Sequence, residues 1–315
     1  MSRPPVAIVG AGIIGRSWAA AFAGAGHPVR LYDPVPGAAE RACPGIERLL
    51  LGPADRDHPR GLAPPRVGGR IDVASTLAKA LDGVVHVQEN APERLDVKRR
   101  VFEELDALAP PGVVLASSTS ALLPSAFAAE LPGARRCLVA HPLNPPHLIP
   151  AVEIVPSEAT GGEAVEATRR LLAGIGQRPF VVNREVAGFV MNRLQGALLD
   201  EAFALVAEGY ATVEAVDTAV RDGLARRWSI MGPFETIDLN APGGIAGFIE
   251  RYGPAYAEIG RDRPARHPWT GALKETVVAA RRSELPAERL TERGAWRDER
   301  LAALAAHFSA QDREV

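Results

Sequence analysis

The sequence predicts an α/β protein, with a Rossmann-type, doubly wound sheet at the N-terminus and an all-helical C-terminal domain. Two patterns support this prediction. Up to about residue 186, short apolar segments alternate with segments whose apolar residues recur every three or four positions, as strands and helices do in βαβ units. Beyond that point only the helical pattern continues. We therefore expect one domain over 1–186 and a second over 187–315.

The predicted strands and helices follow one another in a regular order. An apolar strand at 6–10 leads through a glycine-rich turn into a helix, and the next strand ends at Asp33. The segment 95–108 has the apolar spacing of a helix, and the Pro- and Gly-rich stretch 52–69 is expected to be a loop. Further strands are expected at VVHVQE (84–89), GVVLASS (112–118), RCLVAHP (136–142) and VEIVP (152–156). This alternation favours a parallel sheet.

The second domain begins with the segment 188–209, GFVMNRLQGALLDEAFALVAEG. The segment is apolar on most of its circumference, whereas a helix on the surface of a protein has one polar face. We therefore expect this helix to be buried, either inside a helical bundle or between subunits.

The composition excludes several classes of function. The 315 residues are 47% hydrophobic and 23% charged, with a net charge of −2 and a pI of about 6.4, so no basic surface for a nucleic acid is expected. No apolar run reaches the ~18 residues of a membrane span, and the chain enters its first strand at once, so we expect a cytoplasmic protein. Cys43 and Cys137 lack the spacing of a metal site, and Cys137 is expected to be a buried apolar residue.

The glycine-rich turn after the first strand indicates a dinucleotide site. Gly10, Gly12 and Gly15 form the pattern G-x-G-x-x-G at the start of a helix, whose free N–H groups attract phosphates. Asp33 is expected to bind the adenine-ribose hydroxyls and to repel a 2′-phosphate, which favours NAD over NADP. The cofactor contacts expected from the turn are Gly10, Gly12, Ile13, Ile14 and Gly15. The alternative is the glycine turn of another α/β protein, with Asp33 as a mere turn residue.

The stretch HPLNPPHLIPAVE (141–153) contains the candidate catalytic residues. His141 follows an apolar strand, and open α/β sheets bind their ligands at the carboxyl ends of strands. The intervening prolines stiffen the connection, so that the next strand can return Glu153 beside the imidazole. A carboxylate on one ring nitrogen fixes the tautomer and leaves the other nitrogen for a substrate. Such a pair is suited to accept a hydroxyl proton while hydride leaves the same carbon.

Three further polar residues lie near predicted strand or helix ends. Ser120 follows the strand at 112–118, Asn144 comes three residues after His141, and Asn192 lies at the start of the helical domain. Each has a structural alternative, because such side chains also cap helices or bond to the backbone. Ser120 in particular could be the N-cap of the next helix.

Together these motifs resemble the 3-hydroxyacyl-CoA dehydrogenase family over nearly the whole chain. The resemblance is carried, in this order, by GAGIIG, APERLDVK, SSTSALLPS, AHPLNPP with VEIVP, and VAGFVMNRLQ with MGPFE. Within the family the chain is most similar to the branch of L-gulonate 3-dehydrogenase and λ-crystallin, through NPPHLIPAVEIVP, GLARRWSIMGPFETIDLNAPGG and the late WRDERLAALA.

The resemblance implies a role for each candidate residue. The family's catalytic pair falls on His141 and Glu153, and its substrate-oxygen partners fall on Ser120 and Asn192. Asn144 occupies a further position of the active site. The same resemblance implies that the helical domain forms a homodimer and closes the cleft.

Other matched positions concern the cofactor and the acid group of the substrate. Glu93, Lys98 and Ser120 match positions on the nicotinamide side of the cofactor. Arg227 matches a position that meets the substrate carboxylate, a task suited to the fork of a guanidinium. Arg226 is adjacent, and the sequence does not separate the two arginines. The alternative for Arg227 is an ordinary surface residue at a helix end.

The leading hypothesis is an NAD-dependent dehydrogenase that oxidises the 3-hydroxyl of a small acid resembling L-gulonate. One alternative substrate is a short 3-hydroxyacyl-CoA, although the lysine-rich hairpin that helps such enzymes hold CoA is replaced at 37–70 by a segment with arginines and no lysine. Another is L-carnitine, whose trimethylammonium group Trp228 could contact.

Two other classes of protein also remain open. A non-catalytic dinucleotide-binding protein is disfavoured because the candidate catalytic residues are all present. A decarboxylating hydroxyacid dehydrogenase would need a lysine on the helix after Gly188, where the sequence has Asn192 and Arg193 but no lysine.

Overall fold

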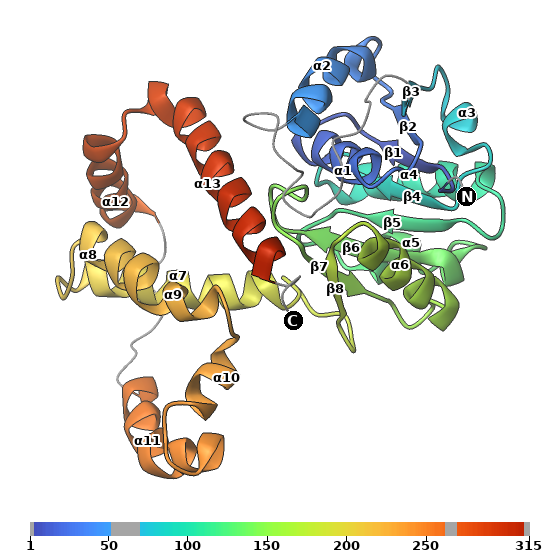
Figure 1. Cartoon of the computed structure of the whole chain (residues 1–315). Helices are drawn as coiled ribbons and strands as arrows, with labels where there is room; N and C mark the ends of the chain where they lie inside the picture. The colour runs from blue at the N-terminus through green and yellow to red at the C-terminus, as the bar shows by residue number, and fades with distance from the viewer. Residues whose placement is uncertain (1–2, 52–69, 262–269, 312–315) are drawn as a thin grey trace. The chain divides into compact units, whose positions relative to one another are not determined.

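The structure is a computed structural model of the chain and describes residues 3–51, 70–261 and 270–311. The chain divides into two compact units, Met1–Arg193 with Glu292–Val315, and Leu194–Thr291. The first contains the sheet, and the second has only helices among its described residues (Figure 1). The predicted succession of an α/β part and a helical part is confirmed. The loop expected at 52–69 lies outside the described residues.

An eight-stranded sheet forms the centre of the first unit, with the strand order β3-β2-β1-β4-β5-β6-β7-β8. The strands are β1 (Val6–Val9), β2 (Val29–Tyr32), β3 (Ile71–Val73), β4 (His86–Glu89), β5 (Val114–Ser117), β6 (Cys137–Pro142), β7 (Ala151–Val155) and β8 (Arg178–Val181). All pairs from β3 to β6 are parallel. The order along the sheet reverses between β1 and β4, which is where open α/β sheets bind ligands at the carboxyl ends of their strands.

The sheet is mixed, which corrects the expectation of a wholly parallel one. β7 runs antiparallel to β6, and β8 is parallel to β7. A parallel neighbour would need a crossover of about a dozen residues or more, whereas only the proline-rich residues 143–150 separate β6 from β7. The short connection therefore requires an antiparallel return. Its register places His141 directly opposite Glu153.

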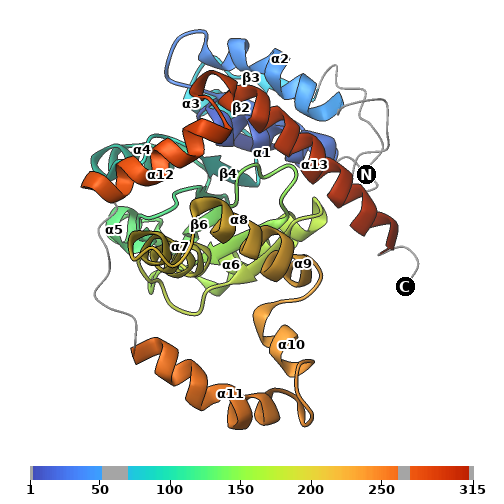
Figure 2. The same cartoon turned by 90° about the vertical axis from the view of Figure 1, so that its left-hand side faces the viewer.

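Helices cover both faces of this sheet, which confirms the doubly wound arrangement. They are α1 (Ile13–Gly24), α2 (Ala38–Leu51), α3 (Leu77–Leu81), α4 (Leu95–Leu108), α5 (Pro124–Ala128) and α6 (Gly162–Gly174), with a 3-10 turn at Ala134–Arg136. α1, α2 and α6 pack on one face, and α3, α4 and α5 on the other. Figure 2 shows α1 beside α2, and α4 beside α5.

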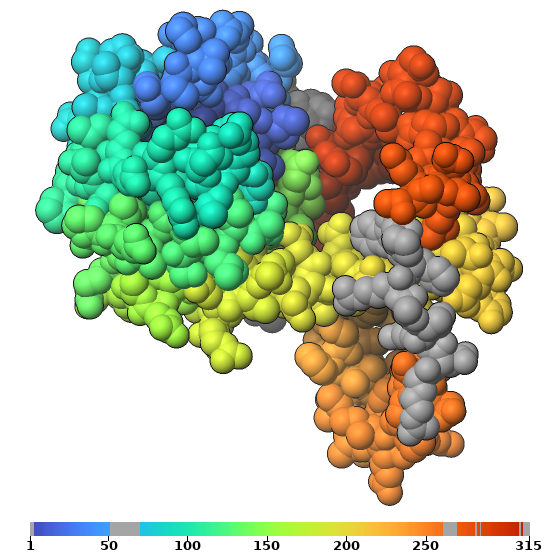
Figure 3. Space-filling model, turned by 180° about the vertical axis from the view of Figure 1, so that it is seen from behind, coloured from blue at the N-terminus to red at the C-terminus, as the bar shows by residue number. Residues whose placement is uncertain are grey.

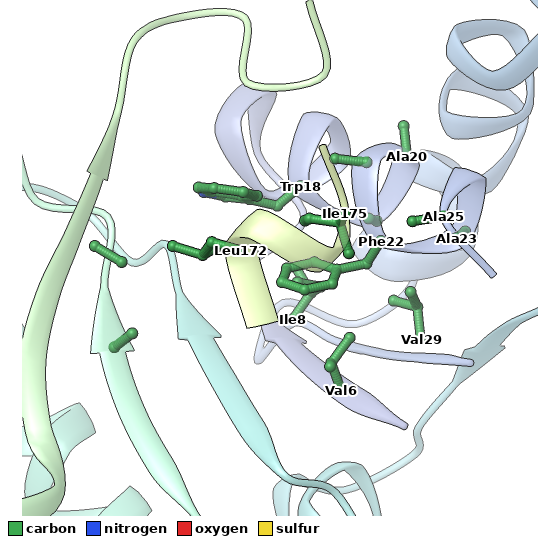
Figure 4. Close-up of a cluster of buried hydrophobic side chains, with 14 of the residues drawn as sticks. Val6, Ile8, Trp18, Ala20, Phe22, Ala23, Ala25, Val29, Leu172 and Ile175 are labelled. Carbon is green, nitrogen blue, oxygen red and sulfur yellow. The ribbon is translucent and has the colours of Figure 1, made fainter. Parts of the chain in front are cut away.

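The apolar cluster under α1 fixes the helix that starts at the glycine-rich turn. Trp18 and Phe22 of α1 are fully buried, and their ring centroids lie 5.8 Å apart. Phe22 points toward the sheet and lies close to Ile8 of β1 and Ile175, which follows α6 (Figure 4). Burial of a side chain of this size contributes roughly 1.5–3 kcal/mol. The start of α1 is therefore held firmly against the carboxyl end of β1.

The opposite face is held by a second cluster, around Phe102 of α4 and Phe127 of α5, whose ring centroids are 4.6 Å apart. The layer of α3, α4 and α5, coloured cyan to green, forms the face of this unit seen in Figure 3. Phe189, at the end of the first unit, belongs to the same cluster. Cys137 is also buried there, and burial raises its pKa to about 12. Its interpretation as a buried apolar residue is confirmed.

The second unit consists of helices among its described residues. Its elements are α8 (Val213–Thr218), the π-helical turn Ala219–Leu224, α9 (Ala225–Trp228), α10 (Pro233–Asp238), α11 (Gly244–Arg261), α12 (Gly271–Glu284) and the 3-10 turn Ala287–Arg289. α7 (Met191–Ala207) and α13 (Leu290–Gln311) each have residues in both units. α10 packs against α11 (Figure 1). None of the helices in the described ranges is long and apolar enough to cross a membrane.

α7 corrects part of the expectation for the segment 188–209. No residue of this helix is buried in the chain as described. Leu194 and Leu198, one turn apart, are 62% and 37% exposed. Burial inside a bundle of the same chain is therefore not observed among the described residues, and burial between subunits stays a prediction.

Candidate active site

A buried imidazole–carboxylate pair lies where β6 and β7 face each other. Nδ1 of His141 is 2.7 Å from Oε2 of Glu153, and the two side chains are 6% and 0% exposed. An ionised carboxylate only accepts hydrogen bonds, so Nδ1 carries the proton. In the neutral ring the lone pair is then on Nε2. The pair can therefore present a proton acceptor to a group beside the imidazole.

The other oxygen of Glu153 is bound by the backbone at the start of α7. Oε1 accepts hydrogen bonds from the N–H groups of Val190, at 2.7 Å, and Met191, at 2.8 Å. The free N–H groups at a helix N-terminus favour a negative charge. Both carboxylate oxygens thus have donors, as a fully buried charge requires.

The loop after β5, which contains Ser120, is held by Glu93. Oε1 of Glu93 accepts hydrogen bonds from the backbone N–H groups of Ser120 and Ala121, both at 3.0 Å, and from the hydroxyl groups of Thr119 and Ser120. Ser120 is not the N-cap of α5, because that position is taken by Leu123. The structural alternative considered for Ser120 is therefore wrong.

Lys98 is buried and paired with Glu89, a residue that the sequence analysis did not single out. Nζ of Lys98 lies 2.9 Å from each oxygen of Glu89 and 3.0 Å from the carbonyl oxygen of Ala91, while Glu93 is 4.0 Å away. Ser117 donates a further hydrogen bond to Glu89, at 2.6 Å. The ammonium group therefore already has three acceptors in the protein. Although Lys98 lies beside the candidate nicotinamide site, its charge is already neutralised by Glu89.

A chain of hydrogen bonds between buried and half-buried side chains links the sheet to the same site. The hydroxyl of Ser118 accepts from Trp18 at 3.1 Å and from Gln88 at 2.7 Å, and it donates to Asn90 at 2.8 Å. Gln88 also bonds to His86 at 3.1 Å, and burial lowers the pKa of His86 to about 4. The imidazole is therefore neutral near pH 7. The only sequence signal for these contacts is that His86, Gln88 and Asn90 are polar residues two positions apart on one predicted strand and its end.

The three glycines of the turn meet different surroundings. Gly10 has a φ of +97°, and a Cβ there would lie 2.8 Å from the carbonyl oxygen of Asn90. At Gly15 a Cβ would lie 1.8 Å from the carbonyl oxygen of Gly10. At Gly12, by contrast, a Cβ would have no atom of the described chain within 4 Å. The fold itself requires the first and third glycines, whereas the open space at the second suits the approach of a ligand.

Asp33 follows β2 directly and lies beside this turn. Its Oδ2 accepts a hydrogen bond from the N–H of Ala11 at 2.8 Å, and its Oδ1 from the N–H of Val35 at 2.9 Å. The carboxylate is thus held in place by the glycine-rich turn itself. Each oxygen keeps a further lone pair, so the group can still accept hydrogen bonds from ribose hydroxyls. These residues fit a bound dinucleotide.

A pocket of about 350 Å³ opens at the carboxyl ends of the central strands, within the first unit. Six of the predicted site residues line it: Ile14, Glu93, Lys98, Ser120, His141 and Asn144. The other lining residues were not predicted: Asn90, Ala91, Ser118, Pro142 and Leu143. The structure thus gathers residues from α1 and α4, from the ends of β4, β5 and β6, and from the β6–β7 connection around one cavity.

The predicted residues not yet placed are not among those that line the pocket. Ile13 is exposed and is not among the residues that line the pocket. Asn192, at the start of α7, donates a hydrogen bond from Nδ2 to the carbonyl oxygen of Ser120, at 2.7 Å. Arg226 and Arg227 are on α9, in the second unit.

Comparison with known protein families matches both parts of the chain. A model for the 3-hydroxyacyl-CoA dehydrogenase NAD binding domain matches residues 5–186, and one for the C-terminal domain of the same enzymes matches residues 188–284. The chain belongs to the 3-hydroxyacyl-CoA dehydrogenase family. It is accordingly an oxidoreductase of the NAD-dependent dehydrogenase type, and its cofactor is NAD.

Several known proteins are similar to this chain over nearly its full length. λ-Crystallin of Oryctolagus cuniculus is 40% identical over 303 residues, which are 95% of each chain. L-carnitine dehydrogenase of Pseudomonas aeruginosa is 40% identical over 301 residues, 95% of this chain and 92% of that one. Among solved structures, 5-formyl-3-hydroxy-2-methylpyridine 4-carboxylic acid 5-dehydrogenase, an NAD+-dependent dismutase, has a TM-score of 0.81 and 29% identity over 98% of each chain.

Substitution of Gly12 by alanine should weaken NAD binding without unfolding the protein. Gly12 has an extended backbone that alanine can adopt, and no atom of the described chain lies near the added methyl group. We expect NADH affinity, measured by fluorescence titration, to fall by about tenfold or more because the backbone must approach the pyrophosphate. Gly15→Ala is the control, since its methyl group would meet Gly10 and should lower the thermal midpoint. Unchanged NADH affinity in Gly12→Ala would contradict this assignment.

Proposed function

We propose that the protein oxidises the 3-hydroxyl group of a small hydroxy acid resembling L-gulonate, with His141 as general base and Glu153 as the residue that orients it. The observation that carries the proposal is the 2.7 Å hydrogen bond between Nδ1 of His141 and Glu153, since His141 also lines the pocket. The substrate class rests on the resemblance of the sequence to the L-gulonate 3-dehydrogenase branch.

In this proposal Nε2 of His141 accepts the proton of the substrate hydroxyl as the C–H bond breaks. Glu153 keeps the proton on Nδ1 and offsets the positive charge that the ring acquires. The hydroxyl of Ser120 and the amide of Asn192 bind the reacting oxygen, and Asn144 offers a further polar contact. NAD, when bound, supplies the acceptor for the hydride.

Arg227 is proposed to bind the carboxylate of the substrate. The two adjacent arginines of α9 differ in their surroundings: the guanidinium of Arg226 lies 3.9 Å from Asp222, whereas the guanidinium of Arg227 has no hydrogen bond or ion pair in the described part of the chain. An unpaired guanidinium can form two parallel hydrogen bonds with a carboxylate. This difference favours Arg227 over its neighbour.

The main alternatives keep the chemistry and change the substrate. L-carnitine is supported by relatives that are L-carnitine dehydrogenases at 40% identity. A trimethylammonium group is best bound by the rings of Trp, Tyr or Phe, however, and none of these is among the residues that line the pocket in the described chain. Trp228, exposed on α9, is the ring that this alternative would use. A short 3-hydroxyacyl-CoA is the other alternative, and several solved relatives are enzymes for such substrates.

Replacing His141 by glutamine should remove most of the turnover. Glutamine cannot act as a base, and general base catalysis contributes roughly 100-fold to 10,000-fold. We expect kcat, measured by NADH absorbance at saturating NAD, to fall within that range while NADH affinity stays within about threefold. His27→Gln is the control, because His27 bonds to Pro4 and Arg3 and is not among the residues that line the pocket. A folded His141→Gln protein with near-normal turnover would refute the assignment.

Initial rates on L-gulonate, 3-hydroxybutyryl-CoA and L-carnitine should identify the substrate class. We expect the highest kcat/KM on L-gulonate. Arg227→Met should raise the KM for L-gulonate by about 10-fold to 100-fold with kcat little changed, since a charged hydrogen bond contributes roughly 1.5–3 kcal/mol. Arg226→Met, the matched control, should change KM by about twofold at most. Equal effects of the two substitutions, or a higher kcat/KM on another substrate, would overturn this part of the proposal.

A homodimer, formed through the domain 187–315, is the assembly we propose. It would cover the apolar side chains of α7, such as Leu194 and Leu198, that the single chain leaves exposed. Light scattering should then give about twice the 33.4 kDa mass of one chain, and the mass of a single chain at micromolar concentration would argue against it.

A further inference from the structure

A strained turn lies between β8 and α7, next to the imidazole–carboxylate pair. Phe189 has a φ of +50°, and it is the only non-glycine residue with a positive φ among the described residues. A bulky side chain strains the backbone in this left-handed region, and such strain is kept where the surroundings demand it. Gly188, just before it, also has a positive φ, of +76°. The chain thus makes two left-handed steps in succession immediately before the helix.

The turn makes one polar and one apolar contact with the pair His141 and Glu153. Directly after it, the N–H groups of Val190 and Met191 point at Oε1 of Glu153, at 2.7 and 2.8 Å. At the turn itself, the ring of Phe189 is fully buried against His141, with ring centroids 5.6 Å apart and planes inclined by 55°. A right-handed conformation at residue 189 would change the direction of the chain and break these contacts. The contacts therefore require the strained conformation.

Hydrogen bonding by Glu153 alone does not fix the plane of the imidazole. The rotation of a histidine ring about its Cβ–Cγ bond has a broad energy profile, and a single hydrogen bond to Nδ1 tolerates a range of ring angles. A ring packed against the imidazole narrows that range. The direction of the Nε2 lone pair is then determined by two contacts, one polar and one apolar.

We propose that Phe189 is a positioning residue that orients His141 toward the pocket. The inference rests on the proposed function, in which His141 is the base, and goes beyond it by assigning a role to a residue that does not line the pocket. The aromatic ring fixes the imidazole plane, while the strained turn aims the first amides of α7 at Glu153. The start of the helix and the catalytic base are thereby oriented by one residue.

Phe189→Leu tests the proposal, because leucine keeps an apolar side chain but removes the ring face. Phe127→Leu is the matched control: Phe127 is buried in the same cluster, packs on Phe102 at 4.6 Å and has no ring contact with His141. Two measurements are compared. One is kcat and KM across pH, and the other is the imidazole NMR spectrum of protein labelled with ¹⁵N-histidine, in which His141→Gln identifies the signal of His141.

In Phe189→Leu we expect kcat to fall by about tenfold or more, with KM and NADH affinity within about twofold, since misdirected catalytic groups lose rate rather than binding. The pH profile of kcat should shift, and the signal of His141 should move and broaden as the imidazole samples several ring orientations. Phe127→Leu should lower the thermal midpoint but leave both readouts as in the wild type.

A Phe189→Leu protein that matches Phe127→Leu in rate and spectrum would overturn the proposal, as would a lower kcat with an unchanged His141 signal. If the wild type turns over none of the substrates tested and the His141 signal still changes only in Phe189→Leu, the proposed function fails and the positioning role stands. Phe189→Met, whose flexible side chain has no ring, replaces the leucine variant should that one fail to fold, with the same expected results.

Discussion

The requirement that a buried carboxylate be fully hydrogen-bonded organises the structure around the candidate site. Glu153 is wholly inaccessible to solvent, and its donors come from His141 on the neighbouring strand and from Val190 and Met191 at the start of α7. Removing one partner of a buried charge typically costs about 3–5 kcal/mol. The side chain of Glu153 therefore fixes the β6–β7 pair and the start of α7 relative to each other. The orientation of the His141 imidazole depends on both.

A second acidic residue has a similar role on the other wall of the pocket. Glu89 joins the end of β4 to Ser117 at the end of β5 and to Lys98 on α4. Glu93 in turn holds the backbone of the loop with Ser120. Reactive side chains at strand ends lie on loops, which are mobile unless they are tied down. Here Glu93 ties down the loop that contains Ser120, and Glu89 joins the ends of the two strands beside it.

Much of the fold could be predicted from the sequence because its signals are local. The helix at 95–108 has the predicted bounds, and β2 ends just before Asp33, since apolar spacing and strand length depend on neighbouring residues. The direction of β7 was missed, although the short connection at 143–150 contained the reason for it. α2 was not predicted, because Pro44 and the neighbouring glycines are typical of a broken segment rather than of a helix. Its buried face is nevertheless a helical apolar stripe: Ala39, Ala42, Ile46 and Leu50.

The candidate site was less predictable, because its geometry depends on contacts between distant parts of the chain. The contact of His141 with Glu153 follows from an antiparallel register, whereas the partners of Glu93 and the left-handed turn at Phe189 have no local signal. The roles of these residues in catalysis, unlike their positions, stay predictions.

The burial of Lys98 has a practical consequence for handling the protein. The sequence has only three lysines, Lys79, Lys98 and Lys274, and Lys98 is 1% exposed and engaged with Glu89. Lys79 and Lys274 are exposed, and neither lines the pocket. Amine-reactive dyes and coupling resins therefore have two lysine targets that leave the cavity untouched, so the protein can be tagged or immobilised through primary amines while its pocket stays open.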